Sequence, residues 1–265
     1  MKINWNLWLS ENEDRRWAEK FYLIYSPVWI LQMLIAMIGG FCVKFGDVGL
    51  MIVSLLVAMP IYVLPPILYP WKRMNRRFYE TFWFKTNCFL TAATLFANYF
   101  GSEYFFDALG MVYNFPQLRL NWDSCLLGTG TQTTPVIMYL LTVAYFSTYY
   151  VTAGIVLRRV RNSKMRKLYP LAVVAVSFFW VFMETFVMAT PIMEGIFWYH
   201  NKSAMLTVGT LFYGMEFLTS FPFYASADEG SNHWTVSHAV MYGAGSYMFT
   251  LLCYDILYGL IRRIY

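Results

Sequence analysis

The sequence predicts an all-α integral membrane protein, a polytopic bundle of about seven transmembrane helices. Three observations support this prediction. Hydrophobic residues make up 58% of the 265 residues and charged residues only 13%, whereas about 25% are charged in an average soluble domain. The mean hydropathy is +0.45. Apolar runs of about twenty residues, each long enough to cross about 30 Å of hydrocarbon as a helix, recur along the chain.

Each predicted span is an apolar run bounded by polar or basic residues. The spans cover residues 21–43, 48–69, 86–106, 135–157, 170–190, 204–224 and 237–260. If a weak segment is re-entrant, five or six spans remain. Residues 1–20 are polar with interspersed tryptophans, which is typical of a short helix at the membrane interface. We therefore expect one transmembrane domain, with 1–20 as an interfacial segment and 21–265 as the bundle.

Two basic loops predict the orientation. They contain Lys72, Arg73, Arg76, Arg77 and Lys85, and then Arg158, Arg159, Arg161, Lys164, Arg166 and Lys167. Two spans separate these loops, so both lie on one side, which the positive-inside rule makes cytoplasmic together with the N-terminus. The net charge of +5 therefore reflects topology and indicates no nucleic-acid partner. The expected location is the endoplasmic reticulum in a eukaryote or the cytoplasmic membrane in a bacterium.

Cofactor motifs are missing from the sequence. The four cysteines are scattered singly, and three histidines are too few for a histidine-rich di-iron site. Neither a GxGxxG nor a GxxxxGK[ST] sequence occurs. Gly243-Ala-Gly245 lies in an apolar run and predicts close helix packing. The sequence gives no reason to expect a metal, a nucleotide or a redox cofactor.

Acidic residues inside or at the edges of apolar runs are the main candidates for chemistry. The set is Glu103, Asp107, Glu184, Glu194, Glu216 and Asp255. Glu184 is the most isolated, with Trp180 one turn before it and Met188 one turn after it on the same face. An ionised carboxylate in mid-bilayer is costly, so we expect Glu184 to be protonated. Either it has a functional role or it only makes an interhelical hydrogen bond.

Residues 98–121 contain a second acidic pair. The four-residue spacing of Glu103 and Asp107 puts both on one helical face, and five aromatic residues lie between positions 99 and 106. Acids in an aromatic wall suggest proton chemistry, although both could equally end a helix, solvated at headgroup level. Glu216 has Tyr213 and Ser220 on its own face.

The chain resembles the cycloeucalenol cycloisomerases, the cyclopropylsterol isomerases of plant-type sterol synthesis. The matching pieces occur in the family's order over roughly residues 20–230. They are Tyr25-Ser-Pro-Val-Trp-Ile30, Trp83, Lys85, Asn87, Asn98-Tyr-Phe100, Tyr104-Phe-Phe106, Leu109-Gly110, Tyr113, Phe115-Pro116, Arg119, Asn121, Glu184-Thr185, Ser203-Ala-Met205, Leu211-Phe-Tyr213, Met215, Ser220-Phe-Pro222 and Asp228-Glu229. The chain departs from the plant pattern at Glu103, Asp107 and Glu216.

The resemblance implies a reaction that consumes no cofactor. Such an enzyme opens the 9β,19-cyclopropane ring of a sterol that enters from the bilayer, by protonation of the ring and loss of the C8 proton. On this resemblance we expect Glu184 to be the general acid and Glu103, helped by Asp107, the base, although the two labels are interchangeable.

The resemblance also assigns a substrate-binding set and leaves two other function classes open. The set comprises Asn98, Tyr104, Tyr113, Trp180, Tyr213 and Glu216. Among these, Tyr213 and Trp180 would stabilise or shape a cationic intermediate, and Asn98 would orient an acid. The alternatives are a sterol-binding or transport protein without chemistry and a proton-coupled transporter of a small apolar solute.

Overall fold

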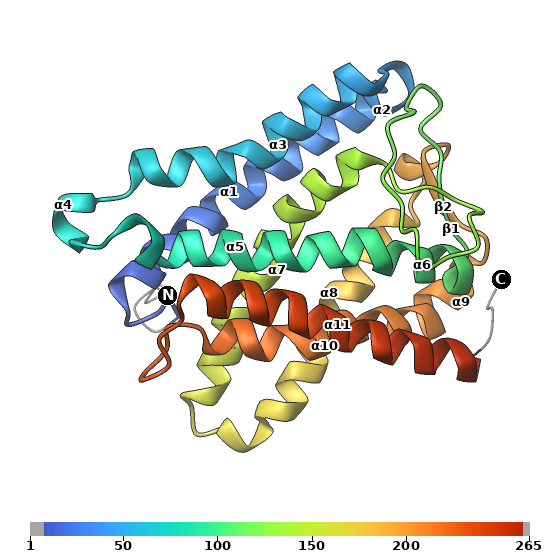
Figure 1. Cartoon of the computed structure of the whole chain (residues 1–265). Coiled ribbons are helices and arrows are strands. Elements are labelled where there is room, and N and C mark those ends of the chain that lie inside the picture. Colours follow the sequence, from blue (N-terminus) through green and yellow to red (C-terminus); the bar gives the residue numbers. More distant parts are fainter. Residues whose placement is uncertain (1–7, 262–265) are drawn as a thin grey trace.

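Long helices build the molecule, with one two-stranded sheet at one end (Figure 1). The structure is a computed structural model that describes residues 8–261. The long helices are α1 (Glu13–Ile38), α3 (Asp47–Leu68), α5 (Phe82–Phe96), α7 (Val136–Arg161), α8 (Tyr169–Met188), α10 (Thr210–Ser226) and α11 (Val236–Ile261). The short ones are α2 (Phe41–Lys44), α4 (Trp71–Met74), α6 (Ser102–Leu109) and α9 (Lys202–Ala204). Strands β1 (Met111–Tyr113) and β2 (Phe197–Tyr199) pair antiparallel.

Two π-helical turns join helices into longer runs. The turn η3 (Ala97–Gly101) links α5 to α6, and η6 (Met205–Gly209) links α9 to α10. A π-helical turn inserts an extra residue, which rotates the side chains that follow it, and such turns are frequent at functional sites. Two residues predicted from the sequence lie at these turns, Asn98 within η3 and Tyr213 one helical turn after η6.

The helical membrane fold agrees with the prediction. In the described part of the chain, four helical stretches are long and apolar enough to cross a membrane: α1, α3, α7 and residues Arg166–Met188. The number of seven spans stays a prediction. Helix α1 begins at Glu13, ahead of the predicted start at Phe21, because Asn12 caps it by accepting hydrogen bonds from two backbone N–H groups of its first turn.

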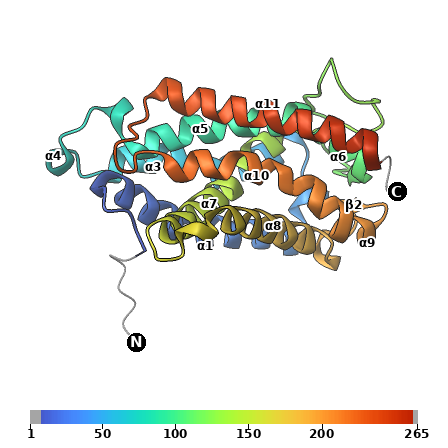
Figure 2. The ribbon, with the colours of Figure 1, turned by 90° about the horizontal axis from the view of Figure 1, so that it is seen from below.

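Helix α7 forms the centre of the bundle. It packs against α1, α3, α5, α8 and α10, and most of its length is buried (Figure 2). Helix α11 lies along α5, where Gly243 permits close approach, because a Cβ there would be 2.6 Å from the backbone oxygen of Phe89. This confirms the packing role expected of Gly243. A Cβ on Gly245 would meet nothing within 4 Å, so the expectation is wrong for that glycine.

A buried charge cluster joins the start of α1 to the end of α7 and to the α10–α11 loop. It consists of Arg15, Glu19, Arg158 and Glu229. The Arg158 guanidinium contacts Glu19 at 2.5 and 2.9 Å and Glu229 at 3.0 Å, and Arg15 Nε lies 3.0 Å from Glu19. The side chains of Arg15 and Arg158 are 0% and 5% exposed, so these charges are compensated by one another and not by water.

Candidate functional site

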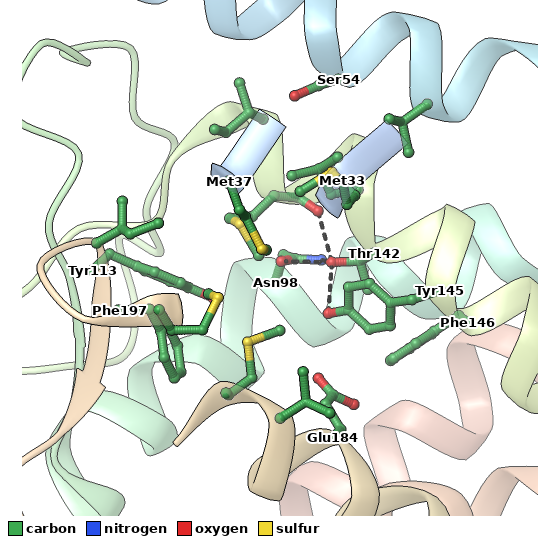
Figure 3. Close-up of a pocket in the computed structure, with 18 of the residues that line it drawn as sticks. Met33, Met37, Ser54, Asn98, Tyr113, Thr142, Tyr145, Phe146, Glu184 and Phe197 are labelled. Atoms are coloured by element: carbon green, nitrogen blue, oxygen red, sulfur yellow. Dashed lines mark hydrogen bonds between the residues drawn. The ribbon is translucent and has the colours of Figure 1, made fainter. Parts of the chain in front are cut away.

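A mostly apolar cavity of about 390 Å³ lies among α1, α3, η3, α7, α8, α10 and the β1–β2 sheet (Figure 3). This volume is within the usual range for small-molecule sites, about 300–1,000 Å³. Several flexible methionines face the cavity, among them Met33, Met37, Met183 and Met188. Methionine adapts its shape to irregular apolar partners, so such a wall suits a rigid apolar ligand.

Glu184 faces this cavity from α8. The Tyr213 hydroxyl donates to Glu184 Oε2 at 2.8 Å, and the Tyr149 hydroxyl also bonds to the carboxyl. Trp180 and Met188 line the same cavity, which confirms the shared face predicted for them. The Trp180 ring stacks on Tyr149 with 4.6 Å between the centroids. Glu184 is therefore an acid held by two phenols beside an aromatic wall.

Glu216 is the second acid that lines the cavity among the described residues. It comes from α10, where the Tyr254 hydroxyl donates to its Oε2 at 3.1 Å. Glu216 and Glu184 are close enough to interact electrostatically. Tyr213, three residues before Glu216 on the same helix, bonds to Glu184. Helix α10 therefore supplies both Glu216 and Tyr213, the hydrogen-bond donor of Glu184, to the same site.

A polar group interrupts the apolar wall on the side of η3 and α7. Asn98 Nδ2 donates to Thr142 Oγ1 at 3.0 Å, and the Tyr145 hydroxyl donates to the same oxygen at 3.1 Å (Figure 3). All three residues line the cavity. Asn98 was predicted from the sequence as a site residue, whereas Thr142 and Tyr145 were not. The available signal was the spacing of Thr142, Tyr145 and Tyr149, which places three hydroxyls on one face of α7.

Glu103 and Asp107 lie outside this cavity. Asp107 accepts hydrogen bonds from the Thr129 hydroxyl at 2.5 Å and the Thr129 backbone N–H at 3.0 Å. The Glu103 carboxyl lies against Gly128, where an added Cβ would be 1.8 Å from Oε2. Both carboxyls therefore hold the loop after β1. Neither residue lines the cavity. The catalytic roles expected of Glu103 and Asp107 stay predictions.

Of the three tyrosines predicted to bind substrate, Tyr213 donates to Glu184, and the other two lie in different places. Tyr113 faces the cavity from β1, and burial raises the pKa of its hydroxyl, which keeps it a neutral donor. Tyr104 does not line the cavity, and its hydroxyl donates to Asp255 at 3.3 Å.

The exposed part of the cavity wall, which we call the mouth, lies on α1 and α8. Of its lining residues, four are substantially exposed: Ile30 (41%) and Leu34 (40%) on α1, and Met183 (39%) and Val187 (48%) on α8. All four are apolar, and the neighbouring outer surfaces of both helices are apolar too. Both helices also meet the length and hydropathy criteria for a membrane span. The mouth is therefore apolar and lies on two helices that are long and apolar enough to cross a membrane.

Comparison with known proteins gives one relative over almost the full chain. The sequence is 30% identical over 261 residues to the cycloeucalenol cycloisomerase of Arabidopsis thaliana, which covers 95% of this chain and 88% of the relative. No protein-family model matches, and no solved structure matches.

Proposed function

This chain belongs to the cycloeucalenol cycloisomerase family, and we propose that it is an isomerase that opens the 9β,19-cyclopropane ring of a sterol such as cycloeucalenol. The observation that supports the proposal most is the pairing of two carboxyl groups, Glu184 and Glu216, in one sterol-sized apolar cavity. Membership of a cycloisomerase family makes the chain an enzyme of sterol metabolism. The specific ring opening and the residues that perform it are the proposal.

The reaction moves two protons and needs no redox partner. A protonated carboxyl gives its proton to C19, the C9–C19 bond supplies the electron pair, and C19 becomes a methyl group. A tertiary cation remains at C9. A carboxylate then takes the proton from C8, and the C8–H electron pair forms the C8=C9 double bond. One acid has lost a proton and one base has gained one, so the sterol is isomerised with no net gain or loss of protons.

Glu184 suits the role of the acid in this scheme. It lies in an apolar wall, and two phenols fix its orientation. Glu216 suits the base or the partner that returns the proton, since it shares the cavity and interacts with Glu184. The aromatic faces of Trp180 and Tyr149 line the same space and can stabilise the cation. Glu103 is the competing candidate for the base.

The substrate enters from the bilayer between α1 and α8 in this proposal. The exposed apolar lining residues Leu34 and Val187 lie at the mouth. A sterol partitions into hydrocarbon, so a mouth that faces lipid receives it without a passage through water. The surrounding lipid is therefore the expected source of the substrate.

We also propose that the end of the bundle with the charge cluster faces the cytoplasm. Ion pairs of Arg76 with Asp14 and of Arg158 with Glu19 bring both basic loops to the start of α1. The positive-inside rule then gives the side. Helix α11 ends at the opposite side of the molecule (Figure 1).

Sterol analysis by mass spectrometry tests the proposed reaction. Purified protein in detergent is incubated with cycloeucalenol in D₂O, with heat-treated protein as the control. The proposal predicts an isomeric sterol with a C8=C9 double bond that carries deuterium in the new C19 methyl group when the acid exchanges with solvent. A non-catalytic sterol-binding or transport protein returns cycloeucalenol unchanged, which would refute the proposal.

A further inference from the structure

The cluster of polar side chains on the η3–α7 wall offers hydrogen-bond acceptors to the cavity. It consists of Asn98, Thr142 and Tyr145, and we name it the acceptor subsite. Asn98 and Thr142 are buried, and Tyr145 is partly buried. All three face the cavity, on a different wall from Glu184 (Figure 3). No carboxyl or ammonium group of the described residues takes part in its hydrogen bonds.

Every hydrogen-bond donor of the acceptor subsite is already used. The two N–H groups of Asn98 Nδ2 go to the Thr94 backbone oxygen at 2.9 Å and to Thr142 Oγ1 at 3.0 Å. The Thr142 hydroxyl donates to the Met138 backbone oxygen at 2.6 Å, and the Tyr145 hydroxyl donates to Thr142. The subsite therefore has no proton to offer a ligand unless one of these hydrogen bonds is broken.

Two acceptor positions remain. Asn98 Oδ1 has only one long contact, 3.3 Å from Thr142 Oγ1. The Thr142 hydroxyl donates instead to the nearer Met138 backbone oxygen, so Asn98 Oδ1 stays available as an acceptor. The Tyr145 oxygen donates its proton and keeps a lone pair. The amide of Asn98 cannot be reversed, because its oxygen would then face the Thr94 carbonyl oxygen, which is also an acceptor. The unused positions of Asn98 and Tyr145 are thus acceptors only.

We propose that the acceptor subsite binds the hydroxyl group of a sterol alcohol as a hydrogen-bond donor and rejects sterols whose oxygen at that position cannot donate. This inference rests on the proposed sterol substrate. The oxygen of a ketone or a methyl ether can only accept hydrogen bonds, as can Asn98 Oδ1 and the Tyr145 oxygen. Such a sterol therefore forms no hydrogen bond with the subsite, and the polar atoms of both ligand and protein stay unpaired. Buried polar sites discriminate strongly on this basis. The subsite thereby fixes which end of the sterol lies against η3 and α7.

The test measures binding separately from turnover. Quenching of the fluorescence of Trp29 and Trp180, which line the cavity, gives the affinity of the purified protein for cycloeucalenol, its 3-ketone and its 3-O-methyl ether. The wild type is expected to bind the alcohol at least about 100-fold more tightly than the ketone or the ether. In Thr142→Val the Tyr145 hydroxyl and one N–H of Asn98 lose their acceptor and become donors. The ketone then binds more tightly, and the alcohol-to-ketone ratio falls to about 10 or less.

Two further variants make the result specific. Tyr145→Phe keeps the ring but removes one acceptor, so the alcohol is expected to bind about 10-fold more weakly and the ketone equally well. Ser54→Ala is the matched control, because Ser54 supplies an isolated hydroxyl to the same cavity from α3. Equal affinities for alcohol and ketone in the wild type, an unchanged ratio in Thr142→Val, or a ratio lost in Ser54→Ala would overturn the inference. A protein that binds the alcohol selectively but forms no isomer refutes the proposed reaction and leaves the acceptor subsite intact.

Discussion

Replacement of Arg158 by methionine should destabilise the protein strongly. Arg158 contacts both oxygens of Glu19, one oxygen of Glu229 and the Trp8 backbone oxygen, at 2.5–3.0 Å. Its removal leaves one cation, Arg15, to neutralise the buried Glu19 and the partly buried Glu229. Removal of one partner of a buried ion pair lowers the free energy of unfolding by about 3–5 kcal/mol, because the remaining charge stays desolvated and unpaired. Methionine retains the length and the apolar stem, so little of the loss comes from packing.

The exposed ion pair between Arg73 and Glu13 provides the matched control. Its side chains are 70% and 41% exposed, and such pairs contribute about 0–1 kcal/mol. Thermal unfolding in detergent, followed by circular dichroism, compares Arg158→Met, Arg73→Met and the double variant Arg158→Met/Glu19→Gln. The double variant should recover part of the loss, because it removes one uncompensated charge. Equal midpoints for Arg158→Met and Arg73→Met would refute the view that the charge cluster stabilises the fold.

Three further changes have defined outcomes. Gly243→Ala should lower the unfolding midpoint, with a cost of about 1–3 kcal/mol, because the added methyl lies 2.6 Å from a backbone oxygen of α5. Gly245→Ala meets no neighbour and should keep or raise the midpoint, because alanine favours a helix over glycine. Gly128→Ala should increase trypsin cleavage of the loop after β1, since its φ is +90° and the methyl would overlap an α6 carboxyl. Val187→Trp should lower kcat/KM about 10-fold or more in liposomes by blocking the mouth, while Val174→Trp on the same helix, away from the cavity, should match the wild type.

The sequence predicted best where one local pattern determines the structure. The apolar run around Glu184 forms α8, and the helical period correctly placed Trp180 and Met188 on its face. Such faces follow from spacing alone. Glu216 and Tyr213 were also selected from one helix, and both line the cavity.

The charge cluster could not be predicted from local sequence patterns. Its members Glu19 and Arg158 are 139 positions apart, and the positive-inside rule already explains a basic residue at the end of a span. Asp228 and Glu229 follow an apolar run in the sequence, where acids are commonly solvated loop residues. Only the tertiary fold shows that Asp228 pairs with Lys85 and that Glu229 pairs with two arginines.

The acceptor subsite was missed for a different reason. Threonine and tyrosine are common in apolar helices, where a threonine hydroxyl ordinarily bonds to the carbonyl four residues before it, as Thr142 does. Its second role, as the acceptor for both Asn98 and Tyr145, depends on the π-helical turn that places Asn98 opposite α7. The positions of Glu103 and Asp107 against the loop likewise depend on where that loop folds back.

Turnover by three glutamine variants tests the central claim most directly. Glu184→Gln, Glu216→Gln and Glu103→Gln each remove a proton-transferring group at nearly constant size, and product formation from cycloeucalenol by purified protein is measured for each. The proposed mechanism predicts that Glu184→Gln and Glu216→Gln each lose about 10²–10⁴-fold in kcat, with unfolding midpoints close to that of the wild type. Glu103→Gln should retain most of its turnover. Wild-type turnover by Glu184→Gln would contradict the mechanism, whatever the other two variants do.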